Sequence, residues 1–230
     1  MTWAQLDFLA VDTETTGVDT AADRIVEVAA VTVHPDGTVG DTWSTIVDPG
    51  IPIPAAASAV HGITNGRAAI EGTTPHDALA HLADLIAGHD GPVVIYNARF
   101  DWPLLLAEAD RHGLPWPDAY LVDPFVLDKH IDPYRRGSRR LPDVAAHHGV
   151  HMAPGTAHGA LADATAAGQL AAALCAAEPR ITACPLPDLQ TWQQRWHDDQ
   201  TESFADYVRR NRDPQFTATL GWPLPDGRAA

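Results

Sequence analysis

The order of strand-like and helix-like patterns along the chain restricts its fold more than any other feature of the sequence. Three segments rich in Val, Ile and Thr come first, at residues 6–12, 24–34 and 38–48, and the turn Pro35-Asp36-Gly37 joins the last two into a hairpin. Beyond them, short apolar segments alternate with helical patterns. Leading antiparallel strands followed by such alternation predict an α/β protein whose mixed sheet is covered by helices.

The remaining elements follow from apolar spacing. Apolar residues recur at helical spacing over residues 75–87, which predicts a helix there. Two short apolar strands are expected at residues 92–96 and 119–123, and they bring the sheet to five strands. Further helices are expected at residues 55–61, 100–112, 124–130, 141–148 and 160–177.

The composition changes beyond residue 178. We expect a main domain over residues 1–178 and a C-terminal helical extension over residues 179–230, with its helix at 191–210. A linker is indicated by three prolines: Pro179, Pro185 and Pro187. The extension either packs on the main domain or forms a partner surface through its aromatic residues, Trp192, Trp196, Phe204 and Tyr207.

The net charge limits the kinds of partner that the chain can grip. The formal charge is −15 over 230 residues. Phosphate contacts dominate binding to long duplexes, so this charge argues against a broad nucleic-acid surface. It does not argue against a small, deep site in which metal ions supply the positive charge. We therefore expect short or single-stranded substrates, or delivery of the substrate by a partner.

Apolar patterning and cysteine content indicate the compartment. We find no apolar run near the roughly 20 residues that a membrane span needs, and no basic segment ahead of an apolar one that would mark a signal peptide. Cys175 and Cys184 are the two cysteines, and we expect them to be reduced. A cytoplasmic protein with no membrane partner is expected.

The first candidate site follows the first strand, in the segment Asp12-Thr13-Glu14-Thr15-Thr16-Gly17. Alternate residues on a strand face the same way, so Asp12 and Glu14 project together. Two neighbouring carboxylates are costly unless a positive charge lies between them. Hard cations such as Mg²⁺ or Mn²⁺ prefer oxygen ligands, which predicts a metal site. A charged strand end without a metal is the alternative.

Two later segments carry residues of the same chemistry. Asn97-Ala98-Arg99-Phe100-Asp101 follows a buried strand and opens a helix, so Asp101 is either a ligand or a helix cap. His158-Gly159 precedes the helix that carries Asp163. A histidine on that loop can accept a proton from water near neutral pH, while Asp163 stays fixed on the helix. A solvated histidine is the alternative.

Taken together, these segments resemble those of the DEDDh exonucleases. That group includes the proofreading epsilon subunit of bacterial DNA polymerase III, ribonuclease T and oligoribonuclease. The resemblance runs from about residue 6 to residue 176. It rests on Asp12-Thr13-Glu14, on Asn97 with Phe100-Asp101, on His158 with Asp163 five residues later, on His61-Gly62-Ile63-Thr64, and on Asp123. Membership implies a ribonuclease H-like fold, which agrees with the element order.

The resemblance also implies roles for individual residues. Two divalent ions, Mg²⁺ or Mn²⁺, are expected on Asp12, Glu14, Asp101 and Asp163, with His158 as the general base. The expected reaction is 3′→5′ hydrolysis of terminal phosphodiesters of DNA or RNA, which releases nucleoside 5′-monophosphates. Residues expected at the terminal nucleotide are Thr15, Thr16, Gly17, His61, Asn97 and Phe100. For Phe100, stacking on a base and packing in the core remain equal alternatives.

One dense basic cluster stands out in this acidic chain. It lies before the His158 segment and contains Arg135, Arg136, Arg139 and Arg140, with Lys129 nearby. We expect Arg139 and Arg140 to bind the substrate backbone, and a solvated basic loop is the alternative.

Two other functions compete with the exonuclease interpretation. One is a catalytically idle module of the same fold that binds nucleic acid or a polymerase, and a DNA polymerase or repair complex is an expected partner in either case. The other is a haloacid-dehalogenase-like phosphohydrolase with Asp12 as nucleophile, which requires a second Asp where Glu14 stands and a later Lys. DNA versus RNA preference, the biological role and the oligomeric state are left open by the sequence.

Overall fold

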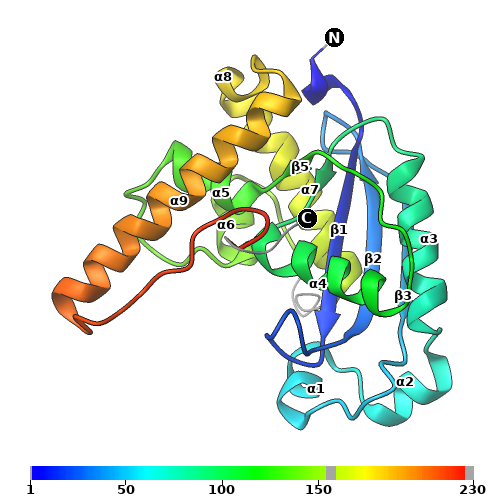
Figure 1. The fold of residues 1–230 in the computed structure, drawn as a ribbon. Helices are drawn as coiled ribbons and strands as arrows, with labels where there is room; N and C mark the ends of the chain where they lie inside the picture. The colour runs from blue at the N-terminus through cyan, green and yellow to red at the C-terminus, as the bar shows by residue number, and fades with distance from the viewer. Residues whose placement is uncertain (1, 154–158, 226–230) are drawn as a thin grey trace.

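The protein is built on one sheet with helices around it (Figure 1). The sheet is mixed, and its strands follow the order β3-β2-β1-β4-β5. The computed structural model describes residues 2–153 and 159–225. β1, β2 and β3 are antiparallel neighbours, whereas β4 and β5 run parallel to β1. The strands are β1 (Phe8–Thr15), β2 (Ile25–Val33), β3 (Val39–Ile46), β4 (Val93–Val94) and β5 (Leu121–Val122). The expected five-stranded mixed sheet is confirmed.

Helices cover both faces of this sheet and continue beyond it. A short 3₁₀ turn, η1 (Trp3–Gln5), precedes β1. The helices are α1 (Ala55–His61), α2 (Asn65–Glu71), α3 (Pro75–Ala87), α4 (Ala98–Arg111), α5 (Pro124–Ile131), α6 (Leu141–His147), α7 (Ala160–Ala177), α8 (Pro179–Thr182) and α9 (Leu186–Asn211).

Alternation along β1 divides the core into two layers. Phe8 and Ala10 pack in the cluster that contains α7, while Leu9 and Val11 pack in the cluster that contains α3 and α4. α7 lies close to the sheet because Gly168 has no side chain, and a Cβ there would stand 2.6 Å from Cγ2 of Val33. The helix is therefore seated directly behind the strand that bears the first acidic residues.

The expectation of no membrane-length apolar segment needs a correction. By length and composition alone, α7 is apolar enough to cross a membrane. Its apolar character has another cause, because Ala164, Leu170 and Leu174 are buried against the sheet. A helix that packs on a sheet and on other helices needs apolar residues on most of its surface.

The residues beyond 178 are helical sooner than expected. Pro179 opens α8 and Pro187 lies in the first turn of α9, so the segment interpreted as a linker is mostly helix. Proline is tolerated in a first turn because the amide that it lacks has no partner there. Three residues of this part, Ile181, Cys184 and Leu189, are buried in the same core as α7. The domain boundary at residue 178 stays a prediction.

Candidate metal centre and active site

Three carboxylates from two elements meet at one end of β1. Asp12 and Glu14 project from the same face of the strand, and Asp163 lies in the first turn of α7. One carboxylate oxygen from each of the three lies within 4.8 Å of the other two, a spacing at which a single cation can contact all of them. Oxygen ligands of this kind suit Mg²⁺ and Mn²⁺.

Asp101 is a fourth acid beside this group. It is buried in the first turn of α4, and its Oδ1 accepts a hydrogen bond of 2.6 Å from the Thr13 hydroxyl on β1. Asn97 occupies the N-cap position of α4 and Asp101 lies within the first turn, so the helix-cap alternative for Asp101 is wrong. Thr13 thereby fixes the Asp101 carboxylate against the strand that carries Asp12.

The electrostatics of the group favour a bound cation. Burial, followed by the charges of Asp163, Glu27 and Asp101, raises the pKa of Glu14 to about 8. Burial and the charges of Asp101 and Asp163 raise the pKa of Asp12 well above its ordinary value. Burial likewise raises the pKa of Asp101 to about 7. A cation among these groups would offset both costs and return the acids to their ionised forms.

Glu27 belongs to the site although sequence reasoning missed it. It pairs with Glu14 across the β1–β2 ladder, and its Oε2 accepts a hydrogen bond of 3.1 Å from the amide of Ala160, the first residue of α7. Glu27 therefore joins the second strand to the helix that carries Asp163. It is the sole acid of the segment predicted as the second strand, but only the strand register places it opposite Glu14.

The turn after Glu14 is folded around Asp23. The Thr16 hydroxyl donates to Oδ1 of Asp23 at 2.7 Å, and the Thr15 hydroxyl donates to the carbonyl of Gly17 at 2.6 Å. A Cβ on Gly17 would lie 2.5 Å from Oδ2 of Asp23, so a larger residue there would displace the Asp23 carboxylate. The structure thus brings the three residues expected at the substrate into one rigid turn beside the acids.

Three other expected substrate residues lie around this turn or at the start of α4. His61 ends α1, and its Nδ1 accepts a hydrogen bond of 3.1 Å from the amide of Ile63. Burial lowers the pKa of His61, while the adjacent backbone of Thr15 partly counters the shift. Phe100 is half-buried in the first turn of α4, and Asn97 is exposed with a left-handed φ of 62°.

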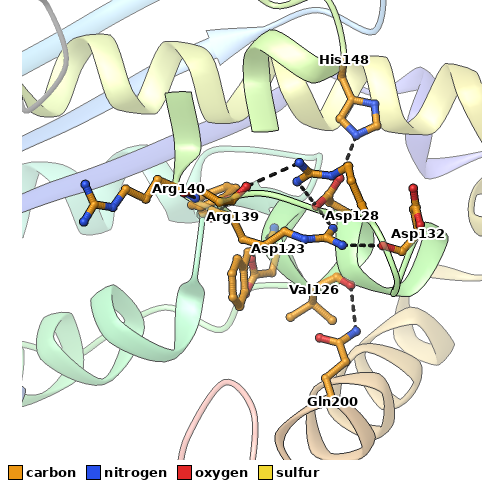
Figure 2. Close-up of polar contacts among 12 residues, drawn as sticks. Asp123, Val126, Asp128, Asp132, Arg139, Arg140, His148 and Gln200 are labelled. Atoms are coloured by element: carbon orange, nitrogen blue, oxygen red, sulfur yellow. Dashed lines mark hydrogen bonds and ion pairs between the residues drawn. The ribbon is translucent and has the colours of Figure 1, made fainter. Parts of the chain in front are cut away.

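The basic cluster is divided between internal and exposed residues. Arg135 and Arg139 both form ion pairs with the buried carboxylate of Asp128, which His148 also contacts at 2.9 Å. Figure 2 shows Arg139 turned toward Asp128 and Asp132, while Arg140 points away from them. Arg140 is exposed, whereas Arg139 holds the loop that precedes α6.

His158, the expected general base, lies outside the described residues 2–153 and 159–225. Its neighbour Gly159 caps α7, four residues before Asp163. The role of His158 stays a prediction.

Comparison with known proteins identifies the family. The exonuclease family RNase T matches residues 9–171, which include Asp12, Glu14, Asp101 and Asp163. The chain belongs to this family. Its acidic cluster is the metal-binding site expected of a DEDDh exonuclease, and the family is metal-dependent.

Individual relatives agree with this assignment. The chain is 34% identical over 172 residues to an uncharacterized exonuclease, CP81, of Escherichia phage 186, covering 70% of this chain and 84% of the phage protein. It is 41% identical over 103 residues to a DNA polymerase III subunit epsilon-like protein of Rhodobacter capsulatus, covering 44% of this chain. The chain spans only 14% of the length of that second relative.

A solved structure agrees at the level of the fold. Exonuclease X in complex with duplex DNA that has a 5′ overhang is similar, with a TM-score of 0.58 and 26% identity over 75% of this chain and 93% of that one. The mixed sheet with its flanking helices is the ribonuclease H-like exonuclease fold that the sequence predicts.

Proposed function

We propose that the protein is a 3′→5′ exonuclease that removes nucleoside 5′-monophosphates from nucleic-acid ends with the help of two divalent cations. One observation carries the proposal: carboxylate oxygens of Asp12, Glu14 and Asp163 lie within 4.8 Å of one another in a chain of the RNase T family. A catalytically idle module of the same fold has no need for three mutually repelling acids at one point.

The donor set fits Mg²⁺ or Mn²⁺. Asp12, Glu14 and Asp163 offer only carboxylate oxygens, and Asp101 adds another beside Asp12. When bound, the ions supply positive charge at the scissile phosphate and lower the pKa of a water molecule. The protein supplies a rigid frame for them, because Thr13 holds Asp101 and Glu27 holds the start of α7.

The remaining residues act on the nucleotide and on the proton. The turn formed by Thr15, Thr16 and Gly17 offers backbone at close range to the terminal sugar, since Gly17 has no side chain. His61 lies against this turn and is kept largely neutral near pH 7, because burial lowers its pKa. His158, in keeping with the family resemblance, accepts the proton of the attacking water.

We propose free DNA 3′ ends as the substrates, with single-stranded or short partly duplex ends preferred. The similarity to Exonuclease X, solved with a 5′-overhanging duplex, supports a DNA end. The net charge of −15 supports a short contact, because a long duplex would meet repulsion beyond the site. Association with a DNA polymerase remains part of the proposal, supported by the epsilon-like relative.

The decisive experiment measures the shortening of oligonucleotides labelled at the 5′ end. Their 3′ ends are free or blocked, and the reaction contains Mn²⁺, Mg²⁺ or chelator. We expect stepwise shortening from free 3′ ends only, and only with metal. Asp163→Asn should abolish it, since one ligand of the cluster is lost. Binding of the oligonucleotide without shortening would instead establish the idle module. DNA, RNA and dinucleotide substrates tested side by side rank the substrate preference.

The proposed role of His158 has its own test. His158→Ala removes the proton acceptor but none of the carboxylates, so turnover should fall by about 10²–10⁴-fold. The rise in melting temperature on adding Mn²⁺ should persist. Turnover near that of the unmodified protein would remove His158 from the mechanism.

A further inference from the structure

A buried carboxylate outside the metal centre organises the start of α4. Oδ1 of Asp123 accepts hydrogen bonds from the amides of Asn97 at 2.9 Å and Phe125 at 3.0 Å. Its Oδ2 accepts from the amide of Ala98 at 3.0 Å and from the indole nitrogen of Trp222 at 3.1 Å. One side chain thus binds the first turns of α4 and α5 and also the C-terminal segment.

This arrangement substitutes for an ordinary helix cap. Asn97 occupies the cap position of α4, but its side chain makes no capping hydrogen bond among the described residues. The first amides of a helix otherwise lack partners, and a carboxylate is favoured there by the helix dipole. Asp123 therefore sets where α4 begins, at Ala98, and Asp101 lies three residues after that start.

The C-terminal segment adds a second tie to the same turn. Residues 219–222, here called the strap, run back from the far end of α9 toward α4 (Figure 1). The Arg99 guanidinium donates to the carbonyls of Gly221 at 2.6 Å, Thr219 at 3.0 Å and Leu220 at 3.2 Å. The amide of Gly221 donates to Asp198 on α9 at 2.8 Å, so the strap is itself held in place.

The strap lies outside the part of the chain that matches the exonuclease family, which ends at residue 171, whereas its partners Arg99 and Asp123 lie inside that part. Trp222 is buried, although it is remote in sequence from every acid of the centre. Nothing in the catalytic fold alone requires its indole N–H to meet Asp123. The hydrogen bond between Trp222 and Asp123 therefore connects the C-terminal part of the chain to the start of α4, which carries Asp101.

We propose that Trp222 is a positioning residue for the metal centre: through Asp123 and the first turn of α4, the strap holds Asp101 where it can share a cation with Asp12. The inference rests on the proposed function only in that Asp101 serves the metal site. Arg99 acts in the same direction, because it lies two residues before Asp101 and its side chain is hydrogen-bonded to the strap.

The test compares two variants that each remove one buried indole hydrogen bond. Trp222→Phe keeps an aromatic ring but removes the donor to Asp123. Trp3→Phe is the matched control, because the Trp3 indole donates to the carbonyl of Cys184 at 3.0 Å, away from the acids, and Trp3 is also buried. Both variants should lose a similar part of their thermal stability.

Calorimetric titration of the substrate-free protein with Mn²⁺ supplies the deciding readout. We expect Trp222→Phe to bind Mn²⁺ about tenfold more weakly, the lower end of what supporting partners of metal ligands contribute, and Trp3→Phe to bind it normally. Activity of Trp222→Phe should recover at high Mn²⁺. Arg99→Lys, which keeps the charge but not the forked hydrogen bonds, should weaken binding in the same direction.

Each outcome decides the question. Unchanged Mn²⁺ affinity in Trp222→Phe and Arg99→Lys overturns the inference, and so does an equal loss in Trp3→Phe, which would mark a general effect of destabilisation. If Trp222→Phe does not fold, Arg99→Lys decides alone against the same control. If the unmodified protein binds Mn²⁺ but has no nuclease activity, the proposed function is overturned. The Mn²⁺ affinities of the variants still decide the inference about Trp222 in that case.

Discussion

The carboxylates of the metal centre hold protons that the same acids release in an unfolded chain. Burial and mutual repulsion raise the pKa of Glu14 to about 8, against an ordinary value near 4.5. Between these two values the metal-free folded state binds more protons than the unfolded state. Its free energy of unfolding therefore falls as the pH rises through this window and is highest below it.

This sign gives a prediction for the metal-free protein. In chelator, the melting temperature should fall from pH 5 to pH 8, and Glu14→Gln should flatten the decline because the charge at that position is gone. Mn²⁺ should restore the loss most strongly at pH 8, since binding to the native state adds stability. Thermal melts across pH measure this, with Glu71→Gln on the exposed end of α2 as the control. Identical slopes in all three proteins would contradict it.

Arg139 and Arg140 are adjacent in sequence but should respond differently to substitution. Arg140 is exposed, so Arg140→Ala should raise KM with little change in kcat and should reduce the salt dependence of binding by about one phosphate contact. Arg139→Ala leaves the buried carboxylate of Asp128 with fewer partners and should lower the melting temperature instead. Kinetics at two salt concentrations and thermal melts separate the effects. Equal KM values for Arg140→Ala and the parent would favour the solvated-loop alternative.

The residues found from sequence are those whose chemistry shows locally. Asp12 and Glu14 are recognisable because strand alternation places two acids on one face, and Asp163 because it opens an apolar helix. The parts played by Glu27 and Asp123 depend on strand register and on amides from distant segments. Neither contact can be predicted from the local sequence. The sequence analysis therefore assigned no role to Glu27, and it named Asp123 only as a position shared with the family.

α7 has little room for a larger side chain where Gly168 faces the sheet. Gly168→Ala should destabilise the protein by about 1–2 kcal/mol, because the new Cβ meets the stiff side chain of Val33 at 2.6 Å. Gly66→Ala in α2 is the matched change, since the nearest atom to its Cβ stands at 4.0 Å, and it should be neutral or stabilising by up to about 1 kcal/mol. Urea unfolding of both variants measures the difference. A stable Gly168→Ala protein would show that the sheet and α7 separate easily.

Several helices were predicted with the bounds that the structure has, whereas α2 was missed. The helices at residues 55–61, 75–87 and 160–177 have the expected bounds. α2 has seven residues, as α1 does, but it contains Gly66, which weakens the helical pattern. Its start depends on Thr64, whose side chain accepts a hydrogen bond from the amide of Arg67. The prolines near residue 178 were interpreted as helix breakers, although first-turn positions make them compatible with helices.

At the scale of the whole molecule, the segment beyond residue 178 contributes to the core. A chain ending at residue 178 would lose Ile181, Cys184 and Leu189 from the cluster around α7 and Trp222 from the cluster on the other face of the sheet. We expect such a chain to be strongly destabilised, because each fully buried large apolar side chain contributes about 1.5–3 kcal/mol. Circular dichroism melts of the two lengths test this. An unchanged midpoint would establish that residues 1–178 fold independently.

The fold class was predictable because five apolar strand patterns and their order leave few topologies. The placement of the extension was not, because it depends on a few apolar residues and on single buried polar groups that the local sequence does not distinguish. Gln193 is fully buried, yet nothing in its sequence neighbourhood distinguishes it from the exposed glutamines of a solvated helix.

The far edge of the sheet is finished by amide side chains. Gln190 pairs with both the amide and the carbonyl of Leu121, and Gln193 joins that carbonyl to the amide of Asp123. A glutamine amide carries one donor group and one acceptor, as a peptide unit does. The two glutamines of α9 therefore make the kind of hydrogen bonds to β5 that a neighbouring strand would make. Pairing of β5 with a strand of another molecule would have to replace these hydrogen bonds. The edge strand therefore offers few free backbone groups for aggregation through strand pairing.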